Sequence, residues 1–216
     1  SYENDKNYEK AAEMYDQLAK VNYQGSKGAV LASNAYKKLG NNEKVIEILI
    51  AAQKDFPSDR DLLLGLVNAQ IDAGNAEGAE VALSAAIASD PNNPQLHYNS
   101  GTIYIELKRN QDAENALKKA LELKPDYVDA QYQLGAHLYN WAFQLKDEAA
   151  FLKIGDPREQ ELNNLAEEKM DGAIKALEKY IESDPNDKSV LKILYKAYHK
   201  QGNEEKAAEY KARLDA

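Results

Sequence analysis

The sequence predicts an all-α protein built from repeated pairs of helices, and three observations support this prediction. Pro57, Pro91 and Pro125 recur at intervals of 34 residues, and Pro185 follows after 60. Glycine–asparagine pairs fall about midway through three of these units, at residues 40–41, 74–75 and 202–203. The segments between these marks are rich in Ala, Leu, Glu and Lys, which are strong helix formers, and they lack strand-like alternation. A glycine that ends one helix and a proline ahead of the next are typical of helix–turn–helix units.

Composition excludes several classes of protein. The chain has 216 residues, with 27 Lys and Arg against 36 Asp and Glu, a formal net charge of −9. This acidic balance argues against nucleic-acid binding, which needs a basic face to neutralise phosphates. There is no cysteine, which excludes disulfides, thiolate zinc sites and cysteine nucleophiles. No apolar run approaches the length of a membrane span.

The sequence offers little for catalysis. It contains no glycine-rich phosphate loop, no His-Glu-x-x-His and no Gly-x-Ser-x-Gly. His97, His137 and His199 fall in different repeats without the spacing of metal ligands, so we expect His97 and His137 to pack and His199 to face solvent. We therefore predict that the protein is not an enzyme, with no catalytic residue, no metal site and no cofactor.

The repeats resemble the tetratricopeptide repeat (TPR) family, in an array of bacterial type. The best match is residues 94–127, which supply Gly101, Tyr104, Ala113, Leu117, Ala120 and Pro125. The sequence departs from the motif at Val67, where glycine is usual, at Ser100, where leucine is usual, and at Lys108, where a turn glycine is expected. The resemblance implies a right-handed superhelical solenoid with a concave groove. It also implies a non-catalytic scaffold that binds a protein or peptide segment in that groove.

The repeat register predicts one solenoid over residues 1–216. Its parts are a partial repeat at 6–25, repeats at 26–59, 60–93 and 94–127, an elongated repeat at 128–187 and a capping repeat at 188–216. The first segment matches only the second helix of a repeat, so we expect a C-terminal fragment of a longer protein. A regulatory or substrate-docking region of a larger enzyme is therefore the alternative function. A similarity to exported bacterial TPR proteins favours the periplasm or cell envelope.

The exposed N-terminal end of such an array also favours self-association. There we expect Ala11, Met14, Tyr15 and Leu18 to pack on the next helix and to leave apolar surface uncovered. The pattern thus makes this end a candidate contact between copies of the chain.

The elongated repeat exceeds its neighbours by 26 residues. Leu138, Trp141 and Leu145 recur at helical spacing within it, so we predict two continuous antiparallel helices over 128–152 and 158–183. Residues 126–187 contain 14 acidic and 6 basic side chains, a net charge of −8. The hairpin is interpreted either as a docking arm or as a solvated helical spur.

The resemblance also implies which residues line the groove: Asn34, Asn68, Tyr98, Tyr132, Tyr139, Asn140, Lys192, Lys196 and Lys200. Asn34 and Asn68 are 34 residues apart, so their amides form a ladder suited to the backbone of an extended peptide. Tyrosines are common anchors at interfaces. The alternative is that the asparagines and tyrosines only face solvent or pack.

Four lysines recur every four residues along one predicted helix, at positions 188, 192, 196 and 200. A row of like charges at this spacing weakens a helix by a few tenths of a kcal/mol per pair. One hypothesis is that the row attracts an acidic peptide segment into the groove. The other is a solubilising cap whose lysines lean toward Asp129 and the acidic hairpin.

Overall fold

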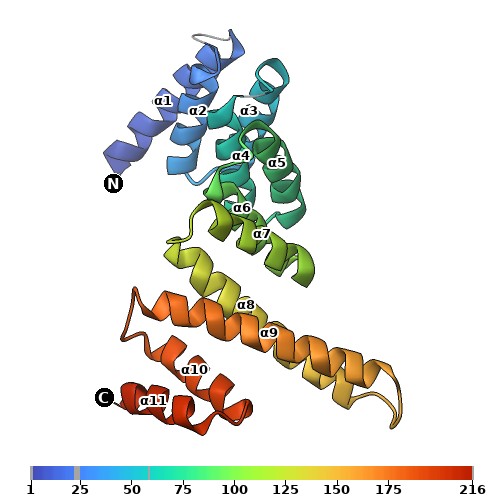
Figure 1. Ribbon diagram of the computed structural model, residues 1–216. Coiled ribbons are helices and arrows are strands. Elements are labelled where there is room, and N and C mark those ends of the chain that lie inside the picture. Colours follow the sequence, from blue (N-terminus) through green and yellow to red (C-terminus); the bar gives the residue numbers. More distant parts are fainter. Residues whose placement is uncertain (1, 22–24, 58, 216) are drawn as a thin grey trace. The chain divides into compact units, whose positions relative to one another are not determined.

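The computed structural model describes residues 2–21, 25–57 and 59–215 of the chain. Within these ranges there are eleven α-helices and no strand, which confirms the predicted all-α fold (Figure 1). The helices are α1 (Tyr2–Lys20), α2 (Lys27–Lys38), α3 (Asn42–Asp55), α4 (Arg60–Asp72), α5 (Ala76–Ser89), α6 (Pro94–Glu106), α7 (Asn110–Leu123), α8 (Val128–Ala150), α9 (Arg158–Ile181), α10 (Lys188–Lys200) and α11 (Glu204–Asp215). Helix α2 packs on α3, α4 on α5, α8 on α9 and α10 on α11.

Four short turns between consecutive helices, α2–α3, α4–α5, α6–α7 and α10–α11, each contain one residue with positive φ. Gly40, Gly74 and Gly202 occupy this position with φ of 72°, 67° and 74°. The same position between α6 and α7 is Lys108, with φ of 58°, the only positive-φ side-chain-bearing residue in the part of the chain that the structure describes. This conformation costs an L-residue about 1 kcal/mol or more, because Cβ approaches the following carbonyl oxygen. The turn therefore forms without its usual glycine, at an energetic cost.

The chain forms two compact units, residues 1–107 and 108–216. In the first unit, successive helices from α1 to α6 pack on one another, and α2 also contacts α4. Leu49, Leu62, Leu63, Leu83 and Leu96 are almost completely buried in its core. The boundary between the units lies between α6 and α7, inside the repeat 94–127, so a single continuous solenoid stays a prediction.

The second unit is built around the hairpin of α8 and α9. The two helices run side by side, as predicted, and each ends two residues before its expected boundary (Figure 1). Helix α7 packs on α8, α10 packs on α9, and α11 packs on α10. The hairpin helices approach closely at Gly135, where an added Cβ would lie 2.6 Å from Leu177 Cδ2 and 3.3 Å from Ala173 O.

The N-terminal helix packs on α2 through a slightly different set of residues from the predicted one. Ala12 is buried, and Tyr15 packs against the core of the first unit. Leu18 is half-buried, but the side chain of Met14 is 65% exposed. The prediction that Met14 packs is wrong, because Ala12 and Tyr15 form the inward face of this helix.

Substituting Gly135 by alanine tests the close approach of α8 and α9. The new methyl group would overlap Leu177, which has no exposed surface, so we expect Gly135→Ala to lower the free energy of unfolding by about 1–3 kcal/mol. The control is Gly65→Ala, whose Cβ would lie 3.4 Å from two Leu49 methyl groups, so it should be neutral or slightly stabilising. Urea unfolding followed by circular dichroism measures both, and an unchanged Gly135→Ala midpoint contradicts the packing.

Candidate functional site

Hydrogen bonds near its N-terminus fix helix α10 to the end of the hairpin. Asp187 Oδ1 accepts from the backbone N–H groups of Ser189 and Val190, and this caps the helix. Asp187 Oδ2 also accepts from the hydroxyl of Tyr180 on α9, at 2.9 Å. Burial and this bond to a carboxylate raise the pKa of Tyr180 to about 12. The start of α10 is therefore tied to the end of α9.

A second tie joins both C-terminal helices to the hairpin. The hydroxyls of Tyr198 on α10 and Tyr210 on α11 both donate to Glu178 Oε1 on α9, at 2.7 and 3.0 Å. The two rings are stacked, with centroids 5.7 Å apart. Burial, followed by the charge and hydrogen bonds of Glu178, raises the pKa of both tyrosines, so both stay protonated donors at neutral pH. Helix α10 is thus held on the side opposite its lysines.

The lysine row lies on the free face of α10. Lys188, Lys192, Lys196 and Lys200 are all exposed. Among the described residues, the structure records no carboxylate within ion-pair distance of any of the four, although lysines elsewhere in this unit, such as Lys146 and Lys179, form ion pairs. Lys200 does lie against the hairpin, at the ring of Phe143, whereas an approach of the other three lysines to Asp129 stays a prediction.

Aromatic side chains of α8 pack in the second unit, and one of them, Phe143, lies at the C-terminal end of this row. Tyr132 and Tyr139 are half-buried and pack against the core of the second unit. The ring of Tyr132 lies 5.3 Å from that of Tyr180, and the ring of Tyr139 lies 4.8 Å from that of Phe143. Lys200 Nζ lies 5.7 Å from the centroid of Phe143, within cation–π range. Asn140, on the same helix, is exposed.

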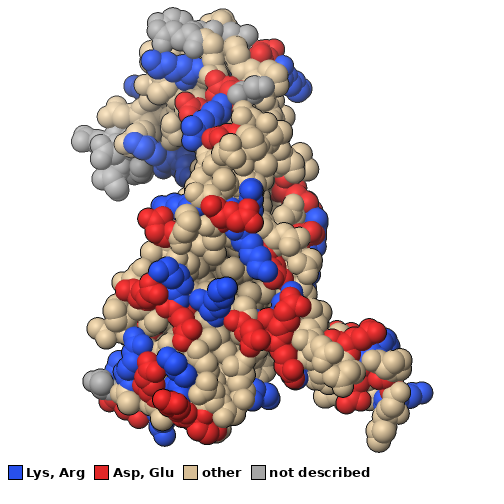
Figure 2. All heavy atoms as spheres, viewed as in Figure 1, with Lys and Arg blue, Asp and Glu red and all other residues tan. Residues whose placement is uncertain are grey.

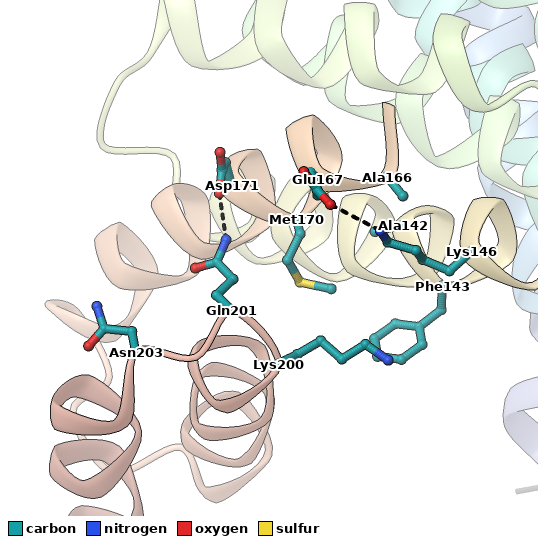
Figure 3. Close-up of a pocket in the computed structure, with 10 residues that line it drawn as sticks. All are labelled: Ala142, Phe143, Lys146, Ala166, Glu167, Met170, Asp171, Lys200, Gln201 and Asn203. Carbon is teal, nitrogen blue, oxygen red and sulfur yellow. Dashed lines mark hydrogen bonds and ion pairs between the residues drawn. The ribbon is translucent and has the colours of Figure 1, made fainter. Parts of the chain in front are cut away.

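A cavity of about 600 Å³ opens where the hairpin passes the end of α10 (Figure 3). We call it the notch; its lining residues are Ala142, Phe143, Lys146, Ala166, Glu167, Met170, Asp171, Lys200, Gln201 and Asn203. Two polar pairs bridge its walls, Lys146 with Glu167 at 3.2 Å and Gln201 with Asp171 at 2.5 Å. Sequence reasoning missed the notch, although Phe143 follows Tyr139 by four residues and so shares its helix face.

The remaining predicted groove residues belong to the first unit. Asn34 on α2 and Asn68 on α4 are exposed, on two helices that contact each other. Tyr98 on α6 is half-buried. The nine predicted residues thus divide into three in the first unit and six in the second.

A buried ion pair lies in the interior of the second unit. Lys169 Nζ on α9 binds Glu114 Oε2 on α7 at 2.8 Å, and both side chains are buried. Lys169 also lies 4.8 Å from the ring centroid of Trp141. Burial alone would raise the pKa of Glu114, but the hydrogen bonds from Lys118 and Lys169 outweigh it and lower that pKa.

The three histidines lie where their register predicts. His137 is buried beside this pair, and its Nε2 is 3.1 Å from the carbonyl oxygen of Asn110. Burial lowers its pKa. His97 is half-buried, with Nε2 2.8 Å from Pro91 O, and His199 is exposed beside Glu204. These contacts indicate packing and capping roles.

The described residues form neither a metal centre nor a membrane span. Within the described residues, no group of three or more His, Asp or Glu side chains is placed to hold a metal ion. None of the described helices is both long enough and apolar enough to cross a membrane.

Comparison with known proteins agrees with the fold. A tetratricopeptide repeat family model matches residues 38–98 and 70–138. The chain is 28% identical over 97 residues to cellulose synthase operon protein C of Pseudomonas fluorescens (strain SBW25), covering 45% of this chain and 8% of that protein. It is 33% identical over 108 residues to the STIP1 homolog of Dictyostelium discoideum, covering 47% of this chain and 18% of that protein. The chain thus spans less than a fifth of either relative.

Solved structures show the same architecture. The structure of YrrB, a TPR protein with an unusual peptide-binding site, aligns with 94% of this chain and 92% of its own, at a TM-score of 0.70 and 20% identity. The repeat register, the family model over residues 38–138 and this structural likeness support a tetratricopeptide repeat fold for the chain.

The buried pair of Glu114 and Lys169 gives a prediction about stability and pH. Glu114→Gln leaves a buried ammonium with only the exposed Glu168 as ionic partner, so we expect a loss of about 3 kcal/mol. The double change Glu114→Leu/Lys169→Met removes both charges and should recover most of that loss. Urea unfolding followed by the fluorescence of Trp141, the only tryptophan, measures both.

The pH dependence of the same variant follows from the lowered pKa of Glu114. The stabilisation it gives is fully present above the ordinary pKa of the unfolded carboxyl, near 4.5, and is lost as pH falls through the lower folded value. Glu114→Gln should therefore lose less stability than the wild type between neutral and acidic pH. Equal acid sensitivity in both proteins contradicts this role.

Proposed function

We propose that this protein is a non-catalytic interaction scaffold, and that the face formed by α8 and α10 binds an acidic segment of a partner protein. The observation that carries the proposal is the row of four exposed lysines on α10 without an ion-pair partner among the described residues. A carboxylate-rich peptide supplies the missing counter-charges.

The position of the row on its helix supports a binding role over simple solubility. Lys188 lies in the first turn of α10, directly after the capping carboxylate of Asp187, and cations are unfavourable at this positive end of the helix dipole. The repulsion along the row adds a further cost. An anionic ligand offsets both effects, whereas a cap meant only for solubility works equally well with mixed charges.

The neighbouring side chains suit a peptide that alternates acidic and apolar residues. Phe143 offers a half-buried ring beside Lys200, and Tyr132 and Tyr139 are half-buried on the same helix; such rings add apolar contact at low entropic cost. Asn140 adds an exposed amide able to donate and accept hydrogen bonds. In the first unit, Asn34 and Asn68 remain proposed ligands for a peptide backbone.

The fold is consistent with this kind of function. TPR proteins bind proteins or peptides, and the structurally similar YrrB has a peptide-binding site. The chain covers only a small part of its curated relatives, so a docking region within a larger enzyme is the second candidate. In both candidate functions, the scaffold and the docking region, the lysine row binds an acidic segment of a partner.

A charge-reversal variant tests the proposal. We expect the wild type to bind a short fluorescent peptide of alternating glutamate and leucine, and to bind it more weakly as salt is raised. Lys192→Glu/Lys196→Glu should weaken binding by about tenfold, or about 1.4 kcal/mol, because two surface attractions become repulsions. Fluorescence anisotropy measures the affinities.

The control is Lys175→Glu/Lys211→Glu, which makes the same change in net charge on exposed positions of α9 and α11. It should bind almost as the wild type does. If the two double variants lose affinity equally, net charge and not the row explains binding. If neither loses affinity, the assignment of the row is wrong.

A further inference from the structure

The far end of the hairpin exposes two large apolar side chains. We define the hairpin tip as residues 151–157, which connect α8 to α9. Phe151 is 91% exposed, and Ile154 is fully exposed. Loops at protein surfaces are normally polar. A single exposed apolar residue needs no explanation, but this short turn exposes two large apolar side chains.

The tip is a hydrogen-bonded turn. The backbone N–H groups of Leu152 and Asp156 donate to the carbonyl oxygens of Ala149 and Lys153, at 3.2 and 3.0 Å. The guanidinium of Arg158 donates hydrogen bonds from Nε and Nη2 to the Asp156 carboxylate, at 3.1 and 2.7 Å. Because this geometry is already fixed, little further ordering is needed when the tip binds.

The flanks of the tip are acidic. Residues 147–161 contain five carboxylates, at positions 147, 148, 156, 159 and 161, against two basic side chains, Lys153 and Arg158. Figure 2 shows red atoms along the projecting end of the hairpin and tan atoms at its extremity. This charge opposes docking on an anionic membrane and favours a socket on a basic surface.

The same chain carries an apolar socket beside an exposed lysine, because the notch is bordered by Lys200, and its two carboxylates already bind Lys146 and Gln201. The notch has an apolar floor, formed by Ala142, Phe143, Ala166 and Met170 (Figure 3). Its volume of about 600 Å³ lies within the range of pockets that hold drug-sized ligands, about 300–1,000 Å³, so two large side chains fit. It borders the capping repeat 188–216, which has 7 basic and 4 acidic residues.

From this complementarity we propose that the hairpin tip of one copy docks into the notch of a second copy. Phe151 and Ile154 occupy the apolar floor, and the acidic flanks of the tip face the lysines of α10. A tip and a notch are different surfaces on one chain, so the contact is heterologous and adds copies head to tail. The apolar contact of Phe151 and Ile154 in the notch does not depend on the proposed binding of an acidic peptide, although both proposals use the lysines of α10.

The geometry makes a mixing experiment possible. In sedimentation of the full 216-residue chain, the average mass of the wild type should rise beyond that of a dimer as concentration increases from micromolar to millimolar. Phe151→Ser/Ile154→Ser removes the tip contact, and Gln201→Trp fills the notch from an exposed position. Each variant alone should stay monomeric, whereas an equal mixture should form dimers and nothing larger.

Further variants keep the test decisive. If Gln201→Trp does not fold by circular dichroism, Lys146→Trp blocks the notch from its other wall. The matched control Met14→Ser/Val21→Ser removes two exposed apolar side chains near the N-terminus and should associate as the wild type does. The mixture should dimerise even where acidic-peptide binding fails, so the two proposals fail separately.

Several results overturn the proposal. The proposal is wrong if the wild type stays monomeric at every concentration or if the tip variant associates as the wild type does. It is also wrong if the equal mixture of the two variants stays monomeric. Loss of association in Met14→Ser/Val21→Ser alone assigns the contact to the N-terminal helix instead. Tip-dependent retention of a monomeric wild type on phosphatidylcholine vesicles assigns the tip to lipid.

Discussion

The close packing of α8 on α9 determines the arrangement of the second unit. Gly135 lets the backbone of α8 approach Leu177, and α7 and α10 pack on these two helices, while α11 packs on α10. Helix α9 is central, because Lys169 binds α7 through Glu114, while Glu178 and Tyr180 bind α10 and α11. The face that carries the lysine row is therefore positioned by contacts made on its opposite side.

Lysines in this unit have two different roles, which their surroundings separate. Lys169 is buried, pairs with Glu114 and Glu168, and lies over an aromatic ring, so its charge is satisfied within the fold. The four lysines of α10 are exposed, and the structure gives none of them an ion-pair partner among the described residues. A buried charge needs its internal partner, because removing that partner destabilises the fold, whereas an exposed row of like charges is available to a ligand.

The helix pairs and the long hairpin could be predicted from sequence, because proline, glycine and apolar spacing are local signals. The buried pair could not, since Glu114 and Lys169 are 55 residues apart and Lys169 fits an apolar helical pattern by its stem alone. The turn at Lys108 lacks its expected glycine yet still forms. The notch escaped prediction because it arises only where the extended hairpin passes the end of α10.

The placement of the binding face on α8 and α10 is the central claim, and a nuclear magnetic resonance titration tests it most directly. The ¹⁵N-labelled chain would be titrated with the glutamate–leucine peptide while backbone amide shifts are followed. The account predicts that the largest changes map to residues 132–143 of α8 and 188–200 of α10. Changes confined to α2 and α4 around Asn34 and Asn68, or to α11, or no changes at all, would contradict it.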